Sequence, residues 1–410
     1  WSSDVCSSDL HTGSVTKWQK NENGGGWTDL AANMTVNQAY SDVTAATTAY
    51  RAVVSNGATC DTEYSTSATI TADPVSVGGS ITSSATVCSG SNGATLTLAS
   101  YTGTITKWQK NENGGGWTDV GKGGSATYAY SNLTVTTEYR AVLTSGTCAA
   151  ANSSTATITV DPVSVGGSIA SSATVCSGAN GATLTLSGHT GTITRWEKNE
   201  NGGGWTSIAN GGSDTYAYSN LTVTTEYRAV LTSGVCAVAN SATATITVDP
   251  VSVGGSITSS ATVCSGSNGA TLTLSGHTGT ITEWEKSENG GAWTSIANGG
   301  SDTYAYSNIT VTTEYRAVLT SGVCALANSA TATITVDAAP VGGSISLSTN
   351  GCYGDNGETL TLSGHSGTIT KWQKNENGGG WTDIGNGGSN TYTYSNLVIT
   401  TQYRAVMDNG

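Results

Sequence analysis

One block of sequence, WxKxENGGxWT, occurs five times in this chain of 410 residues. Its first tryptophan recurs at Trp18, Trp108, Trp196, Trp284 and Trp372. The first spacing is 90 residues and the next three are 88, so one folded unit is copied in tandem. A unit of this length can bury a small core of its own, unlike a solenoid repeat. We therefore expect a function that depends on repetition, because a single catalytic centre would not need to be copied with its scaffold.

The composition narrows the class of protein further. The net charge is −13 with only 15 basic residues, which argues against a nucleic-acid partner. Only 10% of the residues are charged, so Thr, Ser, Asn and Gly must supply most of the surface. Phe is absent, and the core must be built from Trp, Tyr, Val, Leu and Ile. No apolar run is long enough to span a membrane, so we expect no membrane insertion.

The ends of the chain depart from the repeat. Residues 1–10, WSSDVCSSDL, match no other part of the chain, and the repeat register begins only at His11. This decapeptide is identified as the translation of a common sequencing-adapter oligonucleotide, so we expect it to be an artefact. The chain stops two residues before a cysteine is due, and we expect both ends to be cuts. The expected domains are 1–10 (non-native), 11–73 (partial, without its N-terminal strands), 74–161, 162–249 and 250–338 (complete), and 339–410 (partial, without its last strand).

Eight cysteines lie in register with the repeat. One set precedes a Ser-Gly or Tyr-Gly pair: Cys88, Cys176, Cys264 and Cys352. The other set follows the YRAV segment or its equivalent: Cys60, Cys148, Cys236 and Cys324. None has CxxC spacing and no histidine is near in sequence, which argues against zinc. Two cysteines per small β-rich unit are typical of disulfides and of an oxidising, extracellular or cell-surface setting.

Two disulfide pairings fit the spacing. Pairing within repeats gives Cys88–Cys148, Cys176–Cys236 and Cys264–Cys324, and it leaves Cys60 and Cys352 without partners. Pairing between repeats gives Cys60–Cys88, Cys148–Cys176, Cys236–Cys264 and Cys324–Cys352. We favour the first, because an autonomous domain usually closes its own loop, with a stabilisation of about 4 kcal/mol on the chain-entropy model.

Within residues 74–161 the pattern is that of short strands. Seven segments alternate apolar and polar residues or are rich in β-formers: 80–82, 94–99, 104–110, 117–120, 126–130, 137–143 and 154–160. In the third of these, a pleat or bulge would bring Ile105 and Trp108 near one another. Residues 111–116 form a Gly-rich hairpin connection. Turn signals every eight to twelve residues, without helical periodicity, predict an all-β fold of two antiparallel sheets packed as a sandwich.

The chain has only four prolines, Pro74, Pro162, Pro250 and Pro340, and each stands at a joint between repeats. Proline ends the last strand of one unit without extending its sheet. The joints are too short for freely jointed beads. We therefore expect a semi-rigid rod with about 30–40 Å per repeat.

Residues 132–142 look like the corner before strand F of immunoglobulin-like and fibronectin-type sandwiches, with a Tyr early in that strand. The tyrosines at this position are Tyr139, Tyr227, Tyr315 and Tyr403. Together with Cys88, Trp108, the NENGGGWTD hairpin and YRAVLTSGTC, this resembles the Ig-like repeats of very large surface proteins of Bacteroidetes-type bacteria, over nearly the whole chain after residue 10. One departure is that the second cysteine follows Tyr139 by nine residues rather than two, so the disulfide does not match the inter-sheet bridge of antibodies.

The polar candidates for a catalytic or metal site each have a plainer structural interpretation. The repeat-register histidines are His11, His189, His277 and His365, and Tyr101 replaces them once, as expected of a turn residue. Glu138 and Arg140 stand two apart on one strand and are expected to form a solvated charge pair. Asp161 and Asp249 could bind calcium at the joints, but these lack dense acidic clusters. We therefore expect no catalytic residue, cofactor or metal.

The best candidates for contact with a ligand are the second tryptophans of the block, Trp117, Trp205, Trp293 and Trp381. An exposed Trp beside Asn and Asp suits stacking on a sugar ring. In a unit without Phe, however, both tryptophans are needed to fill the sandwich, and we favour the core for these residues.

These features favour a non-catalytic stalk or adhesin region of a large extracellular bacterial surface protein. The expected partners are cell-surface glycans or proteins, besides the neighbouring repeats of the same chain. One alternative is a carbohydrate-binding array, in which weak Trp contacts add through avidity. Another is a set of accessory modules of a secreted enzyme whose catalytic domain lies outside this chain.

Overall fold

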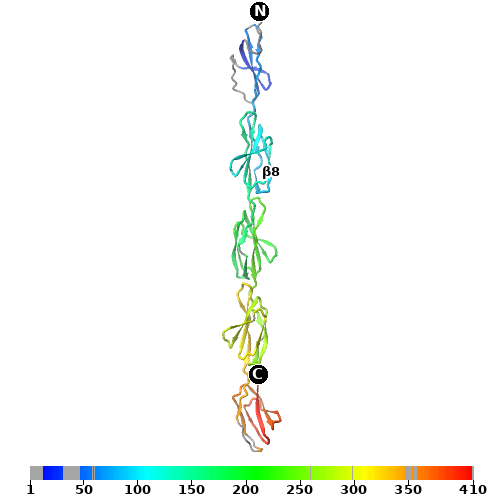
Figure 1. Cartoon of the computed structure of the whole chain (residues 1–410), viewed down its shortest axis with the longest axis vertical. Helices are drawn as coiled ribbons and strands as arrows, with labels where there is room; N and C mark the ends of the chain where they lie inside the picture. Colours follow the sequence, from blue (N-terminus) through cyan, green and yellow to red (C-terminus); the bar gives the residue numbers. More distant parts are fainter. Residues whose placement is uncertain are drawn as a thin grey trace.

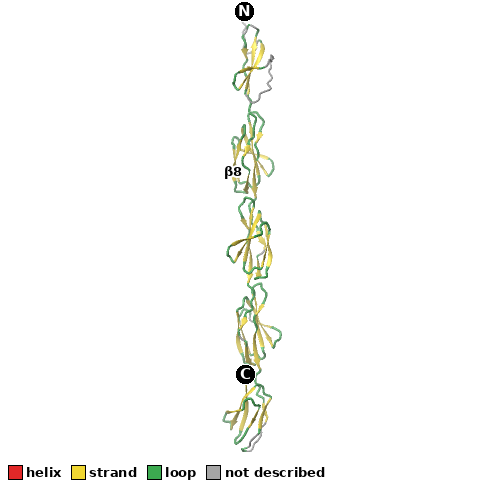
Figure 2. Cartoon of the chain, turned by 180° about the vertical axis from the view of Figure 1, so that it is seen from behind, coloured by secondary structure: helices red, strands yellow, loops and turns green. Residues whose placement is uncertain are grey.

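The computed structural model describes residues 13–30, 47–57, 59, 61–170, 172–258, 260–297, 299–346, 353–354 and 358–408. These residues form β-strands and connecting loops, and the strands gather into five units that follow one another along a single long axis (Figures 1 and 2). The expected artefact at residues 1–10 lies outside the described residues, as do His11, Cys60 and Cys352.

The second unit shows the complete pattern. Its strands are β6 (Ser80–Ile81), β7 (Ala85–Cys88), β8 (Gly93–Ala99), β9 (Thr104–Glu112), β10 (Trp117–Gly121), β11 (Thr127–Ser131), β12 (Thr137–Thr144), β13 (Ala151–Asn152) and β14 (Ala156–Asp161). A small sheet has the order β11-β8-β6, and a large sheet has the order β10-β9-β12-β14-β7 with β13 beside β12. All neighbours are antiparallel except β14 and β7, which are parallel. This arrangement is an Ig-like sandwich.

The third and fourth units repeat this topology strand for strand. The third comprises β15 (Ser168–Ala170), β16 (Ala173–Cys176), β17 (Gly181–Ser187), β18 (Thr192–Glu200), β19 (Trp205–Ile208), β20 (Thr215–Ser219), β21 (Thr225–Thr232), β22 (Ala239–Asn240) and β23 (Ala244–Asp249). The fourth comprises β24 (Ser256–Ile257), β25 (Ala261–Cys264), β26 (Gly269–Ser275), β27 (Thr280–Glu288), β28 (Thr294–Ile296), β29 (Thr303–Ser307), β30 (Thr313–Thr320), β31 (Ala327–Asn328) and β32 (Ala332–Asp337).

The outer units show parts of the same pattern within the described residues. The first has one sheet of β1 (Ser14–Glu22), β2 (Trp27–Asp29), β3 (Thr48–Ser55), β4 (Glu63–Tyr64) and β5 (Ala68–Ile70). The fifth has two sheets built from β33 (Ser344–Ser346), β34 (Thr359–Ser363), β35 (Thr368–Glu376), β36 (Trp381–Gly385), β37 (Thr391–Thr393) and β38 (Thr401–Asp408).

The predicted all-β sandwich is confirmed, and each of the seven predicted strands of the second unit lies within two residues of an observed one. The prediction missed β7 and the two-residue β13. The four residues of β7, ATVC, are too few to show alternation. They form a strand only because β14 offers its open edge, in a parallel pairing that places Cys88 opposite Asp161.

Among the described residues, the core clusters of the second to fifth units are each built around the first tryptophan of the repeated block. Trp108 is fully buried and its indole N–H donates to the carbonyl of Ser125 at 3.0 Å. A bulge in β9 at Thr106 turns Trp108 to the same face as Ile105, as the sequence predicted. Tyr128 stacks on Trp108 with ring centroids 5.6 Å apart. The equivalents Trp196, Trp284 and Trp372 are also fully buried.

Alkaline pH is expected to destabilise the three central units through their strand-F tyrosines. Burial, together with the neighbouring tyrosines, raises the pKa of Tyr139, Tyr227 and Tyr315 to about 12. Because the unfolded chain ionises first, near pH 10, the stabilisation is complete below that pH and is lost as the pH rises through about 12. The loss is about 2–3 kcal/mol per unit. Urea titrations from pH 8 to 12 check it, and a Tyr227→Phe variant should lose the third unit's share of the dependence.

Candidate functional site at the joints between units

The peptide link between units is short and is tied down on both sides. Strand β14 ends at Asp161, Pro162 follows, and Val165 already bridges to Thr190 of the third unit. Between them, the hydroxyl of Ser164 accepts a hydrogen bond at 2.9 Å from the backbone N–H of Ser233 in the loop after β21. The same bond joins Ser76 to Ser145 and Ser252 to Ser321. The linker is therefore part of the unit that follows it.

The aspartate that ends one unit also binds the next unit through its side chain. The Asp161 carboxylate accepts a hydrogen bond from the backbone N–H of Val235 at 2.9 Å. Beside it, Gly234 has φ +50°, and a Cβ there would lie 1.8 Å from Asp161 Oδ2, so any other residue would displace the carboxylate. Equivalent bonds run from Val323 to Asp249 and from Thr147 to Asp73. The joint aspartates thus bind backbone amides of the following unit.

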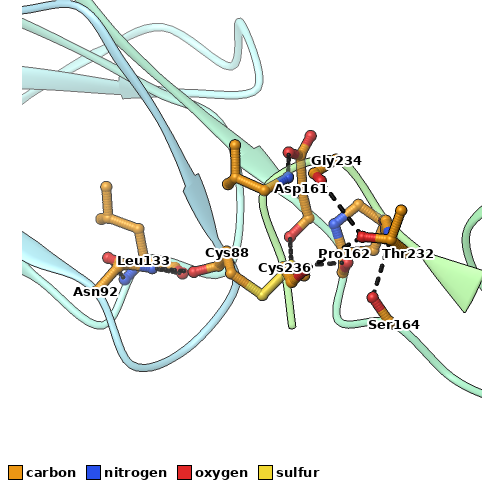
Figure 3. Close-up of a disulfide and its surroundings, with 11 residues drawn as sticks. Cys88, Asn92, Leu133, Asp161, Pro162, Ser164, Thr232, Gly234 and Cys236 are labelled. Atoms are coloured by element: carbon orange, nitrogen blue, oxygen red, sulfur yellow. Dashed lines mark hydrogen bonds between the residues drawn. A yellow bond between two sulfur atoms is a disulfide. The ribbon is translucent and has the colours of Figure 1, made fainter. Parts of the chain in front are cut away.

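Disulfides cross two of the joints. Cys88, at the end of β7, is bonded to Cys236, in the loop between β21 and β22 of the next unit, with Cα atoms 4.9 Å apart (Figure 3). Cys176 is bonded to Cys324 in the same way. The backbone at both sulfurs is held in place, because Asn92 donates to the carbonyl of Cys88 at 2.7 Å and Thr232 donates to that of Cys236 at 3.2 Å.

Both pairings proposed from the sequence are wrong. The parallel alignment of β7 with β14 carries Cys88 to the end of the unit where the chain leaves it. Cys148 lies at the opposite end, because Thr147 beside it donates to Asp73 of the preceding unit. Two cysteines of one unit therefore cannot meet, and Cys88 meets the Cys148 equivalent of the next unit. Of the six predicted disulfide cysteines, four are bonded, whereas Cys148 (half-buried) and Cys264 (exposed) are free.

The second tryptophans lie outside the core, contrary to the favoured prediction. Trp117, on the edge strand β10, is half-buried and is not part of the core cluster. The guanidinium of Arg140 lies 4.1 Å from the centroid of its ring, a cation–π contact. The same contact covers one ring face of the other three candidates, Trp205 (Arg228), Trp293 (Arg316) and Trp381 (Arg404). Each tryptophan thus supports an arginine on the outer face of the large sheet.

The arginine stands in a network that differs between units. In the second unit Arg140 donates to Gln109 at 2.9 Å, and Glu138 accepts from Asn111 at 2.8 Å, so each bonds across the sheet to β9. The third unit has Glu197 in place of Gln109, paired with Arg228 at 2.7 Å and Arg195 at 2.8 Å. Burial opposes ionisation of Glu197, but hydrogen bonds from the two arginines lower its pKa below the usual value. These are structural ion pairs.

The described histidines, His189, His277 and His365, lie where the sequence placed them, in the turn between the second and third predicted strands. His189 follows β17, and its Nε2 atom is 3.8 Å from Asp214 Oδ1. In the part of the chain that the structure describes, no three His, Cys, Asp or Glu side chains are grouped to hold a metal ion. No helix among these residues is long and apolar enough to cross a membrane.

Serial two-sheet sandwiches define a tandem Ig-like repeat protein. The chain matches the sequence model of a family described as a domain of unknown function (DUF8696) five times, over residues 2–74, 77–162, 165–250, 253–338 and 341–410, and it belongs to that family. No curated protein matches the chain.

Several solved structures of tandem domains are similar to this chain. An E-to-A variant of titin domains I67–I69 has 12% identity and a TM-score of 0.42, covering 65% of this chain and 99% of its own. Drosophila OTK extracellular domains 3–5 have 12% identity and a TM-score of 0.29, covering 65% and 99%. Sidekick-1 immunoglobulin domains 1–5 have 9% identity and a TM-score of 0.30, covering 95% and 91%.

Proposed function

We propose that this chain is a non-catalytic stalk region of an extracellular bacterial surface protein, which holds an adhesive or other functional part away from the cell. The observation that carries the proposal is the pair of disulfides that cross from the second unit to the third and from the third to the fourth. A disulfide within a domain stabilises that domain, whereas one between domains also restricts their relative orientation. Restricting orientation is useful in a spacer.

Three connections act together at each of the two joints that a disulfide crosses. The peptide link runs through proline, the aspartate carboxylate binds the next unit's backbone, and the disulfide forms a second covalent connection beside the peptide link. Interfaces between domains of one chain are otherwise small and permit motion. A joint fixed at several points costs more to bend than one held by its peptide link, so the rod keeps its length.

The disulfides at the joints also support the proposed extracellular location. Disulfides persist in oxidising compartments, and a surface with only 10% charged residues and many Thr and Ser side chains suits a protein outside the cell. The resemblance to repeats of large bacterial surface proteins supports a cell-surface location. Glycans or proteins of another cell surface remain the proposed partners of the complete protein.

A carbohydrate-binding array receives less support from the geometry. A sugar stacks on an open aromatic face, and one face of Trp117 and of each equivalent is already covered by an arginine guanidinium. A glycan array probed with the full chain separates the two functions. Binding that is lost on replacing the four tryptophans by alanine would favour the array over the stalk.

Small-angle X-ray scattering of the oxidised full chain tests the stalk. We expect a maximum dimension of about 150–200 Å, from about 30–40 Å for each of five units. Chelation of divalent cations should leave it unchanged, since backbone N–H groups occupy the joint carboxylates. A compact particle, or one that shortens on addition of chelator, would contradict the proposed joint.

A further inference from the structure

The two disulfides are interlaced along the chain. Each joins cysteines 148 residues apart, and the loops they close share residues 176–236. The shared segment contains β17–β21, which include the core tryptophan of the third unit. Both cysteines of the third unit are bonded, one to each neighbour.

The cysteines also stand close to the points where the chain enters and leaves the third unit. Cys236 Sγ lies 3.2 Å from the carbonyl oxygen of Pro162, at the entry. Cys176 ends β16 opposite Asp249, at the exit, because β16 and β23 are parallel. Each disulfide therefore runs beside the peptide link at a joint, and tension along the rod can pass from unit to unit by two covalent connections.

The interlaced disulfides shorten the covalent path along which tension passes through the three central units. From Asp73 to Asp337 the backbone has 264 residue steps. With both disulfides the shortest route takes 15 steps from Asp73 to Cys88, 60 from Cys236 back to Cys176 and 13 from Cys324 to Asp337, which is 88 in all. The remaining 176 steps are hidden from extension even if all three central units unfold.

We propose that the interlaced disulfides limit the extension of the chain under tension, a function beyond that of a spacer. An extended chain gains about 3.3–3.6 Å per residue, so the hidden length is about 600 Å. Residues 176–236 of the unfolded third unit carry the tension between their two anchors, whereas the segments 88–176 and 236–324 stay slack. The stalk thus resists lengthening by covalent connectivity, whatever the mechanical strength of the individual sandwiches.

The hidden lengths of interlaced loops do not add, which gives the proposal a specific signature. One disulfide alone hides 148 steps, whereas the two together hide 176. Removing either one should therefore lengthen the fully stretched chain by only 28 steps, about 100 Å. Removing both should lengthen it by about 600 Å. Independent loops would instead give a total equal to the sum of the two single effects.

Single-molecule force spectroscopy on the oxidised full chain, tethered at its two ends, tests this. The variants are Cys88→Ser with Cys236→Ser, Cys176→Ser with Cys324→Ser, and all four together. The expected gains in total contour length are about 100, 100 and 600 Å. The matched control, Cys148→Ser with Cys264→Ser, removes the two free thiols and should leave the length unchanged.

Other pairings give different values. Pairing within repeats would make the first variant break two loops of 60 residues, a gain of about 400 Å. Additive gains, or a control that lengthens the chain, would overturn the proposal without affecting the scattering test of the stalk.

Discussion

Replacing Trp196 with alanine is expected to lower the free energy of unfolding of the third unit by about 3–5 kcal/mol. The side chain is fully buried, its N–H donates to the carbonyl of Ser213 at 3.0 Å, and its ring stacks on Tyr216. The substitution leaves a cavity between the sheets and an unpaired carbonyl. Since a domain is stable by only about 5–15 kcal/mol, a large fraction of that stability is lost. Hydrogen exchange of the β18 and β21 amides in the full chain measures the effect on this unit alone.

The matched control is Trp205→Ala in the same unit. Trp205 is half-buried on the edge strand β19, and its main described contact is the guanidinium of Arg228 at 4.1 Å. Losing that contact should cost about 0.5–1 kcal/mol. Equal losses from Trp196→Ala and Trp205→Ala would show that the core is not centred on the first tryptophan.

The two tryptophans of each block show which part of the core could be predicted from the sequence and which part could not. Alternation along residues 104–110 predicted the strand, and a pleat or bulge was expected to bring Trp108 beside Ile105. The bulge at Thr106 does so, whereas strict alternation would turn the two side chains to opposite faces. The second tryptophans were assigned to the core by a volume argument, the absence of Phe. That argument failed because Tyr128 and Tyr139 fill the space, with ring centroids 5.2 Å apart. Arg140, the residue after Tyr139, then covers Trp117 from outside.

The joint could be predicted only in part. Proline, glycine and cysteine at regular positions indicated that the connection between units is structured. The small number of residues between units indicated a semi-rigid rod. The disulfide partner could not be read from spacing, because it depends on a parallel strand pair that four residues form at a sheet edge. One signal was available. In such a sandwich, strand F ends near the point where the chain enters the unit. A cysteine shortly after that strand therefore faces the preceding unit and not the other cysteine of its own unit.

The interlaced disulfides have a thermodynamic consequence that does not require force. A Cys88→Ser, Cys236→Ser variant opens a loop of 148 residues and keeps the disulfide between Cys176 and Cys324. On the chain-entropy model, closing such a loop restricts the unfolded chain by about 5 kcal/mol. The effect on the folded state is smaller, because the aspartate and serine bonds at the joint remain.

The variant is therefore expected to lower the stability of the second and third units by up to about 5 kcal/mol, with a smaller change in the fourth. Urea denaturation followed by hydrogen exchange in β12, β21 and β30 resolves the three units. The control, Cys148→Ser with Cys264→Ser, removes as many sulfurs from the same structural positions in other units, but both are free thiols. If the control destabilises the chain as much as the variant does, the bonded cysteines act through packing of the sulfur atoms and not through the covalent link.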